Sequence, residues 1–139
     1  MASLTELANP ARFMRLSSML LPWLSGAAAL LLVIGFYLVW FVAPSDYQQG
    51  ETIKIMYIHV PAAWLALMFY SMMTLSALGV LVWRHPLADV AQKAAAPIGA
   101  CFALICLLTG SFWGKPMWGT YWVWDARLTS MLVLFLLYL

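Results

Sequence analysis

The residues best suited to chemistry in this chain lie in a tryptophan-rich segment, residues 118–125. The segment contains Trp118, Tyr121, Trp122, Trp124 and Asp125. A tryptophan ring is large, flat and amphipathic, so it can stack on a flat ligand and can also settle at the membrane–water boundary. The segment therefore indicates either a ligand platform or a membrane anchor, and the residues alone leave both interpretations open. If it is helical, all of these residues except Trp124 share one face.

The other tryptophans make this segment unusual. They fall near the ends of apolar stretches, where an aromatic belt at the membrane boundary places them. These belt positions are Trp23, Trp40, Trp64, Trp83 and Trp113. The tryptophans of residues 118–125 are additional to that belt, because they occupy a connecting stretch rather than the end of a span.

His59 is the second residue that could do chemistry. It precedes Val60 and Pro61 at the start of an apolar stretch. Because a residue before proline is biased toward an extended backbone, we expect the histidine to be held at a helix entrance. A neutral imidazole there is a good ligand for iron or copper, although a boundary histidine can instead bond water or backbone. His85 is interpreted as a solvated loop residue.

Two cations flank the tryptophan-rich segment, with Lys115 before it and Arg127 after it. A porphyrin is flat and apolar, and it takes an axial nitrogen on its iron and cations at its propionates. His59 could supply the nitrogen, and Lys115 and Arg127 the cations. Two alternatives stay open: Arg127 can pair locally with Asp125, and Asp125 can cap the helix that follows.

The composition places these residues in a membrane protein. The chain has 139 residues, of which 65% are hydrophobic and 9% charged, and its mean hydropathy is +0.92. Soluble domains carry about 25% charged residues. The net charge of +2 comes from scattered basic residues, which argues against a nucleic-acid partner. Because the sequence has no nucleophile triad, phosphate loop or carboxylate cluster, we assign no catalytic residue and predict that the protein is not an enzyme.

Four uncharged stretches predict helices over residues 21–42, 61–83, 95–113 and 127–139. The first three are long enough for the roughly 20 residues that a bilayer span needs. The fourth is cut off at Leu139. We therefore predict an all-α integral membrane protein with three complete transmembrane helices plus the start of a fourth. Residues 1–139 would form the N-terminal part of a longer polytopic domain, with residues 114–126 as a tryptophan-rich connection.

The predicted spans set which loops share a side of the membrane. Two complete spans separate the first loop from the third, so His59 and the tryptophan-rich segment lie on the same face and His85 on the opposite one. A small excess of basic residues on the side of the N-terminus favours a cytoplasmic N-terminus. That inner side carries Arg12, Arg15, Arg84 and Lys93, and the outer side carries Lys54, Lys115 and Arg127.

The cysteines point to packing rather than to redox chemistry. Cys101 and Cys106 lie in one apolar run, on different faces of an ideal helix. Because that spacing suits a disulfide poorly, we interpret both as small core residues.

The tryptophan-rich segment and residues 126–130 after it resemble the signature of the tryptophan-rich (WWD) superfamily of haem-handling membrane proteins. Residues 43–50, 57–63 and 110–119 also resemble one family of that superfamily, which acts in cytochrome c maturation. The similarity covers nearly the whole chain. The tryptophan signature points to the superfamily, and the additional segments point to the one family.

The resemblance implies a six-helix bundle in the bacterial inner membrane, with both termini in the cytoplasm. It implies haem b bound transiently at the periplasmic face, between the tryptophan-rich segment and two axial histidines. His59 matches the first axial ligand, and the second would lie beyond Leu139. The implied role is to present haem to a periplasmic haem chaperone, which ABC-type transporter subunits and a small membrane subunit then release.

Two other functions stay open. A cytochrome c synthase of the same superfamily, which joins haem to CxxCH thiols, shares the tryptophan signature, but such proteins resemble longer chains with larger outer loops. A structural or small-molecule transport subunit would use the tryptophans only as anchors. Few charges lie inside the predicted spans, so the sequence offers no ion path to support transport.

Overall fold

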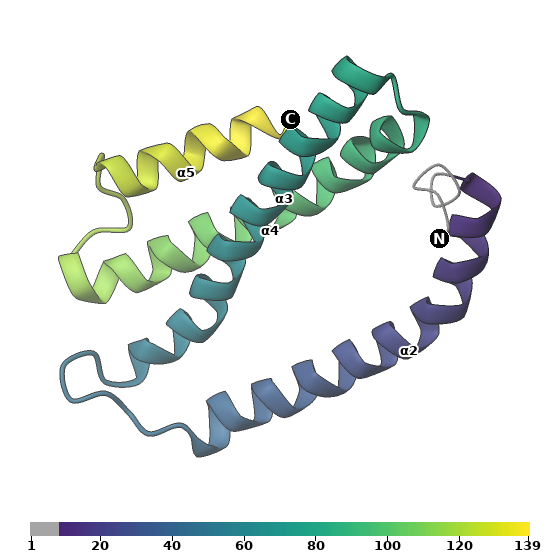
Figure 1. Cartoon of the computed structure of the whole chain (residues 1–139). Coiled ribbons are helices and arrows are strands. Elements are labelled where there is room, and N and C mark those ends of the chain that lie inside the picture. The colour runs from purple at the N-terminus through teal and green to yellow at the C-terminus, as the bar shows by residue number, and fades with distance from the viewer. Residues whose placement is uncertain (1–8) are drawn as a thin grey trace. The chain divides into compact units, whose positions relative to one another are not determined.

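The computed structural model describes residues 9–139, and within them the chain is built of helices (Figure 1). Three stretches are long and apolar enough to cross a membrane: Pro10–Val42, Glu51–Trp83 and Pro86–Trp118. Each has 33 residues. At about 1.5 Å per residue, such a helix is longer than a hydrocarbon core of about 30 Å, so its ends reach the polar boundary. The predicted architecture of three long apolar helices and a short fourth is confirmed.

The helical elements follow one another with short connections. They are α2 (Pro10–Tyr37), a π-helical turn η1 (Leu38–Val42), a 3₁₀ helix η2 (Glu51–Ile55), α3 (Met56–Trp83), α4 (Pro86–Trp118) and α5 (Ala126–Leu137). The chain divides into two units, one ending at Ala43 and the other comprising Pro44–Leu139. Residues 1–8 of the predicted domain lie outside the described residues.

Helices α2 and α4 begin earlier than the apolar pattern predicts, because residues at their N-termini favour helix beyond the apolar run. At α2, the Asn9 side chain accepts a hydrogen bond from the Ala11 N–H, and Pro10 occupies the first helical position. Proline suits that position because its missing N–H has no helical partner there. At α4, Pro86 plays the same part, and the Lys93 amine pairs with the Asp89 carboxylate one turn back, at 2.7 Å.

The start of α3 also differs from the prediction. The 3₁₀ helix η2 leads directly into Met56, so Pro61 lies inside the helix rather than in its first turn. Val60 is accordingly helical, not extended. The expected position of His59 at the helix entrance is nevertheless correct, because the residue lies in the first turn of α3.

The end of α4 changes the description of the tryptophan-rich segment. The helix continues through Trp118 and stops at Gly119, which adopts the left-handed conformation at φ 77° and donates its N–H to the Lys115 carbonyl. Glycine adopts this conformation without a steric penalty. Trp118 is therefore in the last helical turn, and the residues between Gly119 and Asp125 are not helical. The helical face considered for the segment does not form.

The core of the second unit lies where α3 and α5 pack against α4 (Figure 1). Ala66 of α3 and Ala103 of α4 are completely buried, and such small residues let two helices approach closely. Tyr138 joins them in the core, and its hydroxyl donates to the Ala66 carbonyl. Aromatic side chains of α3 and α4, including the stacked pair Phe69 and Phe102, surround this cluster.

Gly99 of α4 is required for this packing, and we expect its replacement to destabilise the protein. A Cβ atom at Gly99 would overlap the ring of Tyr138. Overpacking of this kind costs about 1–3 kcal/mol. Gly99→Ala in the complete protein should therefore lower the free energy of unfolding by about that amount, measured in detergent. Gly35→Ala, at a site with open space within 4 Å, is the control. Equal stability of the two variants would contradict the packing described for α4 and α5.

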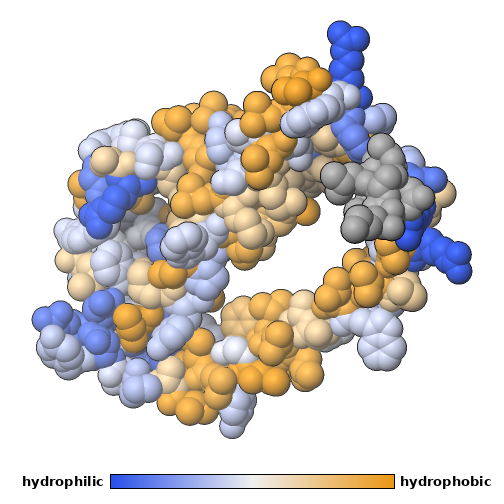
Figure 2. All heavy atoms as spheres, viewed as in Figure 1, coloured by the Kyte–Doolittle hydropathy of each residue, from blue (hydrophilic) through white to orange (hydrophobic). Residues whose placement is uncertain are grey.

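Most large apolar side chains face outward. Figure 2 shows hydrophobic residues over the lengths of the helices and hydrophilic residues gathered toward the helix ends. Trp64, Leu75 and Leu81 of α3, for example, are each more than two-thirds exposed, at 71%, 69% and 78%. Surfaces this apolar suit a hydrocarbon environment, in which helices satisfy their own backbone hydrogen bonds.

Candidate functional site

His59 projects from the first turn of α3 toward α4. Its Nδ1 atom lies 3.0 Å from the hydroxyl oxygen of Thr109. The Cys106 sulfur lies 3.8 Å from the same nitrogen and 4.0 Å from Nε2. The imidazole is partly buried. The packing of α3 on α4 therefore holds the histidine between helices, with polar contact on one side of the ring.

Two glycines of α4 make room for the aromatic rings. A Cβ atom at Gly110 would lie 3.0 Å from the Cε1 atom of His59. A Cβ atom at Gly114, one turn later, would lie 3.0 Å from the Cε3 atom of Trp118. Because both glycines are buried on the same face of α4, they form a shallow cradle that receives the imidazole and the indole.

A cavity of about 350 Å³ opens beside the imidazole. Small-molecule sites measure about 300–1,000 Å³, so this cavity is large enough to take part of a ligand. Its lining comes from α3, α4 and α5 and is mainly apolar. The lining residues are Met56, His59, Ala63, Cys106, Leu107, Gly110, Trp113, Trp118, Arg127, Leu128 and Met131.

Two indoles form the aromatic part of the cavity lining. Trp113 and Trp118 meet edge to face, with ring centroids 5.2 Å apart and planes at 88°. The Trp113 Nε1–H donates to the side-chain oxygen of Gln49 at 2.9 Å. Gln49 belongs to a tight turn in which the Asp46 carboxylate accepts its backbone N–H at 2.8 Å. The loop before η2 therefore fixes the orientation of Trp113 on α4.

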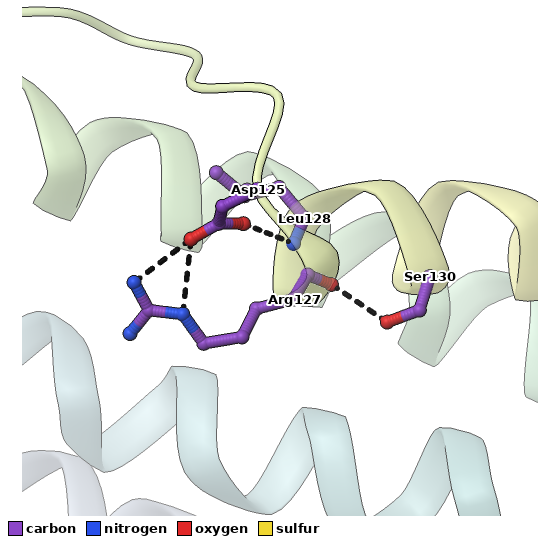
Figure 3. A network of polar contacts seen from close by, with 4 residues as sticks. All are labelled: Asp125, Arg127, Leu128 and Ser130. Atoms are coloured by element: carbon purple, nitrogen blue, oxygen red, sulfur yellow. Dashed lines mark hydrogen bonds and ion pairs between the residues drawn. The ribbon is translucent and has the colours of Figure 1, made fainter.

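Asp125 connects the tryptophan-rich segment to α5 (Figure 3). One carboxylate oxygen accepts the Leu128 N–H at 2.9 Å, which caps the helix, and the other accepts both Nε and Nη2 of Arg127, at 3.0 and 2.8 Å. The two alternatives considered for Asp125 therefore occur together. The Arg127 guanidinium also lies 5.3 Å from the centre of the Trp118 ring, within cation–π range.

We expect the Asp125 cap to weaken in acid. The Leu128 N–H bond and then the Arg127 side chain lower the pKa of Asp125 below its ordinary value of 3.8. A carboxyl whose pKa is lower in the folded state stabilises the fold above its unfolded pKa, and that contribution disappears as the pH falls through the folded value. Asp125→Asn keeps an acceptor for the cap but does not titrate. The thermal stability of the parent should therefore exceed that of the variant at neutral pH.

That difference should shrink as the pH falls below about 3.8, the ordinary value for the carboxyl. A difference in stability between parent and variant that stays constant from neutral pH to pH 3 would contradict this assignment.

The structure brings three of the residues predicted from the sequence together at the cavity: His59, Trp118 and Arg127. Lys115 is not among them, because its amine donates to the Gly119 carbonyl at 3.0 Å and lies 5.2 Å from the centre of the Tyr121 ring. It therefore closes the end of α4.

The remaining tryptophans of the segment also lie outside the cavity lining. Trp122 and Trp124 meet each other, with centroids 5.4 Å apart, and Trp124 is 76% exposed. The Trp122 Nε1–H is buried and has no hydrogen-bond partner among residues 9–139. A buried donor of this kind is rare in proteins, so a ligand or another part of the protein that supplies an acceptor would be stabilised here.

The whole chain, apart from the first two residues, matches a known family model. Residues 3–139 match the model described as heme exporter protein C. This chain belongs to the heme exporter protein C family. The resemblance found in the sequence is thereby confirmed, and the family is described as an exporter rather than as an enzyme.

The relatives that carry this family name are similar along nearly all of the chain. Heme exporter protein C of Bradyrhizobium diazoefficiens is 63% identical over 99% of this chain and 52% of its own length. The proteins of the same name from Paracoccus denitrificans and Escherichia coli K12 are 53% and 49% identical, over 99% and 98% of this chain and 56% of their own lengths. The chain therefore spans about half the length of these heme exporter C proteins.

Several site residues of this heme exporter C chain were not predicted from the sequence. Thr109 and Gly110 were not assigned to the site because they lie inside an apolar run, and Trp113 was interpreted as part of the aromatic belt. The cysteines were interpreted as core residues, which is correct for buried Cys106 and wrong for Cys101, which is exposed on α4. The glycine was the available signal in the sequence, because glycine inside a helix often marks a place where another group approaches the backbone closely.

Proposed function

We propose that the complete protein binds haem b at the periplasmic face of the bacterial inner membrane and delivers it to a periplasmic haem chaperone during cytochrome c maturation. The main observation that supports this proposal is the cavity, whose lining includes His59, Trp118 and Arg127 from three different helices. Family membership supports the same proposal, because the relatives are named heme exporter protein C. In this proposal residues 1–139 are the N-terminal part of one polytopic domain, and the N-terminus is cytoplasmic.

The residues at the cavity fit a haem. The imidazole of His59 would provide a nitrogen ligand for the iron, and the indoles of Trp113 and Trp118 would provide an apolar aromatic surface for the macrocycle. The glycine cradle lets the rings of His59 and Trp118 lie against α4, because a Cβ atom at Gly110 or Gly114 would come within 3.0 Å of them. When bound, haem would supply the iron centre, and the residues of this chain would hold and orient it.

The charged and outer residues have separate parts in this proposal. Arg127, held by Asp125 and exposed over 76% of its side chain, would meet a propionate at the edge of the cavity. The buried N–H of Trp122 would be satisfied by a second propionate or by its water shell. Lys115 and the exposed rings of Tyr121 and Trp124 would extend the binding surface outward, toward the chaperone.

The rest of the site and its partners would come from outside this chain. The resemblance to the haem-handling superfamily supports a second axial histidine from the part of the relatives' length that the chain does not span. It also supports a maturation complex with ABC-type transporter subunits and a small membrane subunit. The lipid bilayer covers the outward apolar faces.

Complementation of a cell that lacks its own heme exporter C gene tests this function. With the complete protein present, we expect haem to appear covalently attached to the periplasmic chaperone, followed by mature cytochrome c. Without the chaperone, no cytochrome c should form. Cytochrome c formation in the absence of the chaperone would instead favour a synthase. Unchanged chaperone loading in cells without the protein would favour a structural or transport subunit.

A further inference from the structure

Thr109 makes three polar contacts through one hydroxyl group. Its oxygen lies 2.7 Å from the Ile105 carbonyl oxygen and 3.2 Å from the Cys106 carbonyl oxygen, both in the preceding turn of α4. It also lies 3.0 Å from Nδ1 of His59, across the helix interface. The hydroxyl carries a single hydrogen, and the three partners compete for it unless one of them is a donor.

The positions of the hydrogens follow from this competition. A carbonyl oxygen only accepts, so the 2.7 Å contact with Ile105 requires the hydrogen of the Thr109 hydroxyl. The contact with His59 must then use a lone pair of that hydroxyl oxygen and the hydrogen of an Nδ1–H group. A neutral imidazole carries one such hydrogen, so Nε2 is left with a free lone pair.

We infer that Thr109 is a positioning residue that selects the Nδ1-protonated form of His59 and so presents Nε2 as the ligating nitrogen. The inference rests on the function proposed above, in which that nitrogen binds haem iron. Hydrogen bonds from the outer nitrogen of a ligating histidine commonly fix the tautomer and the ring orientation in metal sites. Here a threonine hydroxyl lies within hydrogen-bond distance of Nδ1, at 3.0 Å.

The acceptor is held in place before any ligand arrives. Threonine is branched at Cβ and therefore has few side-chain conformations on a helix, and its bond to the carbonyl four residues back removes the remaining freedom. Gly110, next in sequence, allows the imidazole to approach α4 closely enough for this bond. The Cys106 sulfur lies 4.0 Å from Nε2, and a sulfur at that distance is a weak partner.

Thr109→Val in the complete protein tests the inference, because valine keeps the shape of threonine and removes the acceptor. We expect the haem affinity to fall about 10- to 100-fold, the usual cost of losing an outer hydrogen-bond partner of a ligating histidine. Thr109→Ser restores a hydroxyl and should recover most of the affinity. Thr74→Val is the matched control, since the Thr74 hydroxyl makes the same kind of bond, to the Tyr70 carbonyl at 3.0 Å, far from His59.

A second readout does not depend on haem. In apo protein labelled with ¹⁵N-histidine, the His59 signals, assigned by comparison with His59→Gln, should show a protonated Nδ1 and a bare Nε2 in the parent and in Thr74→Val. In Thr109→Val they should show a mixture of tautomers or the reverse form. A merely structural role for Thr109 would alter stability without changing this pattern.

The two readouts separate the possible failures. A parent with protonated Nε2, or a Thr109→Val variant with the parent's tautomer and haem affinity, would overturn the inference. A parent that has the expected tautomer, lost in Thr109→Val, but binds no haem would uphold the part assigned to Thr109 and overturn the proposed haem function.

Discussion

Replacing His59 by alanine in the complete protein is expected to remove nearly all bound haem. Loss of an outer hydrogen-bond partner alone costs about 10- to 100-fold in metal affinity, so loss of the ligating ring should cost at least about 100-fold. The haem-to-protein ratio, measured as pyridine haemochromogen after purification at matched abundance, should therefore approach zero. The apolar cavity and the indoles would remain, but without an axial nitrogen on this side of the iron.

The matched control for this prediction is His85→Ala. His85 precedes the first residue of α4, at the opposite end of the α3–α4 pair from His59, so its loss should leave the haem-to-protein ratio unchanged. Equal haem content in the parent and in His59→Ala would contradict the ligand assignment. Equal losses in both histidine variants would mean that the effect arises from folding or insertion, not from ligation.

Gly110→Leu should prevent haem from occupying the cavity and leave helix α4 intact. A Cβ atom at this position would already lie 3.0 Å from the Cε1 atom of His59, and the rest of a leucine side chain would have to occupy the cavity or displace the imidazole. Leucine is a better helix former than glycine by somewhat less than about 1 kcal/mol, so the helix itself is not weakened. We expect haem content to fall at least about tenfold, which corresponds to about 1.4 kcal/mol or more of binding energy.

Two further variants make this result interpretable. Gly110→Ala should give an intermediate loss, because only a small shift of the imidazole accommodates one methyl group. Gly26→Leu adds the same side chain to α2 at a site with nothing within 4 Å, and should leave haem content and helicity unchanged. Full haem content in Gly110→Leu, with the circular dichroism of the parent, would contradict the location of the site.

The long helices could be predicted from the sequence, because apolar composition alone is enough to indicate them. Long uncharged runs predict membrane-spanning helices because lipid tolerates no exposed backbone, so α2, α3 and α4 were expected. The helix ends were less predictable. Asn9 and Pro10, and Pro86 with the Asp89–Lys93 pair, extend α2 and α4 into polar sequence that a hydropathy pattern excludes. The helical position of Trp118 depends on Gly119, whose left-handed conformation no apolar pattern reveals.

The sequence predicts which parts of the site lie on the same side of the membrane, because the number of spans between them fixes this. Two spans return the chain to the same side of the membrane, so His59 and the tryptophan-rich segment were expected on the same face. Which turn of α4 faces His59 depends on the register set by Ala66 and Ala103, and no local sequence feature reports that register. Thr109 and Gly110 were not predicted for this reason, although the imidazole packs against both of them.

In the proposed function, His59 ligates haem iron through Nε2. The most direct test is the oxidised and reduced absorption spectrum of the complete, detergent-purified protein beside His59→Ala at matched abundance, with and without added imidazole. We expect a six-coordinate haem spectrum in the parent and its loss, or a change to a five-coordinate form, in the variant. Added imidazole should restore the parent spectrum by filling the vacated position. Identical spectra in parent and variant, or a parent without haem bands, would contradict it.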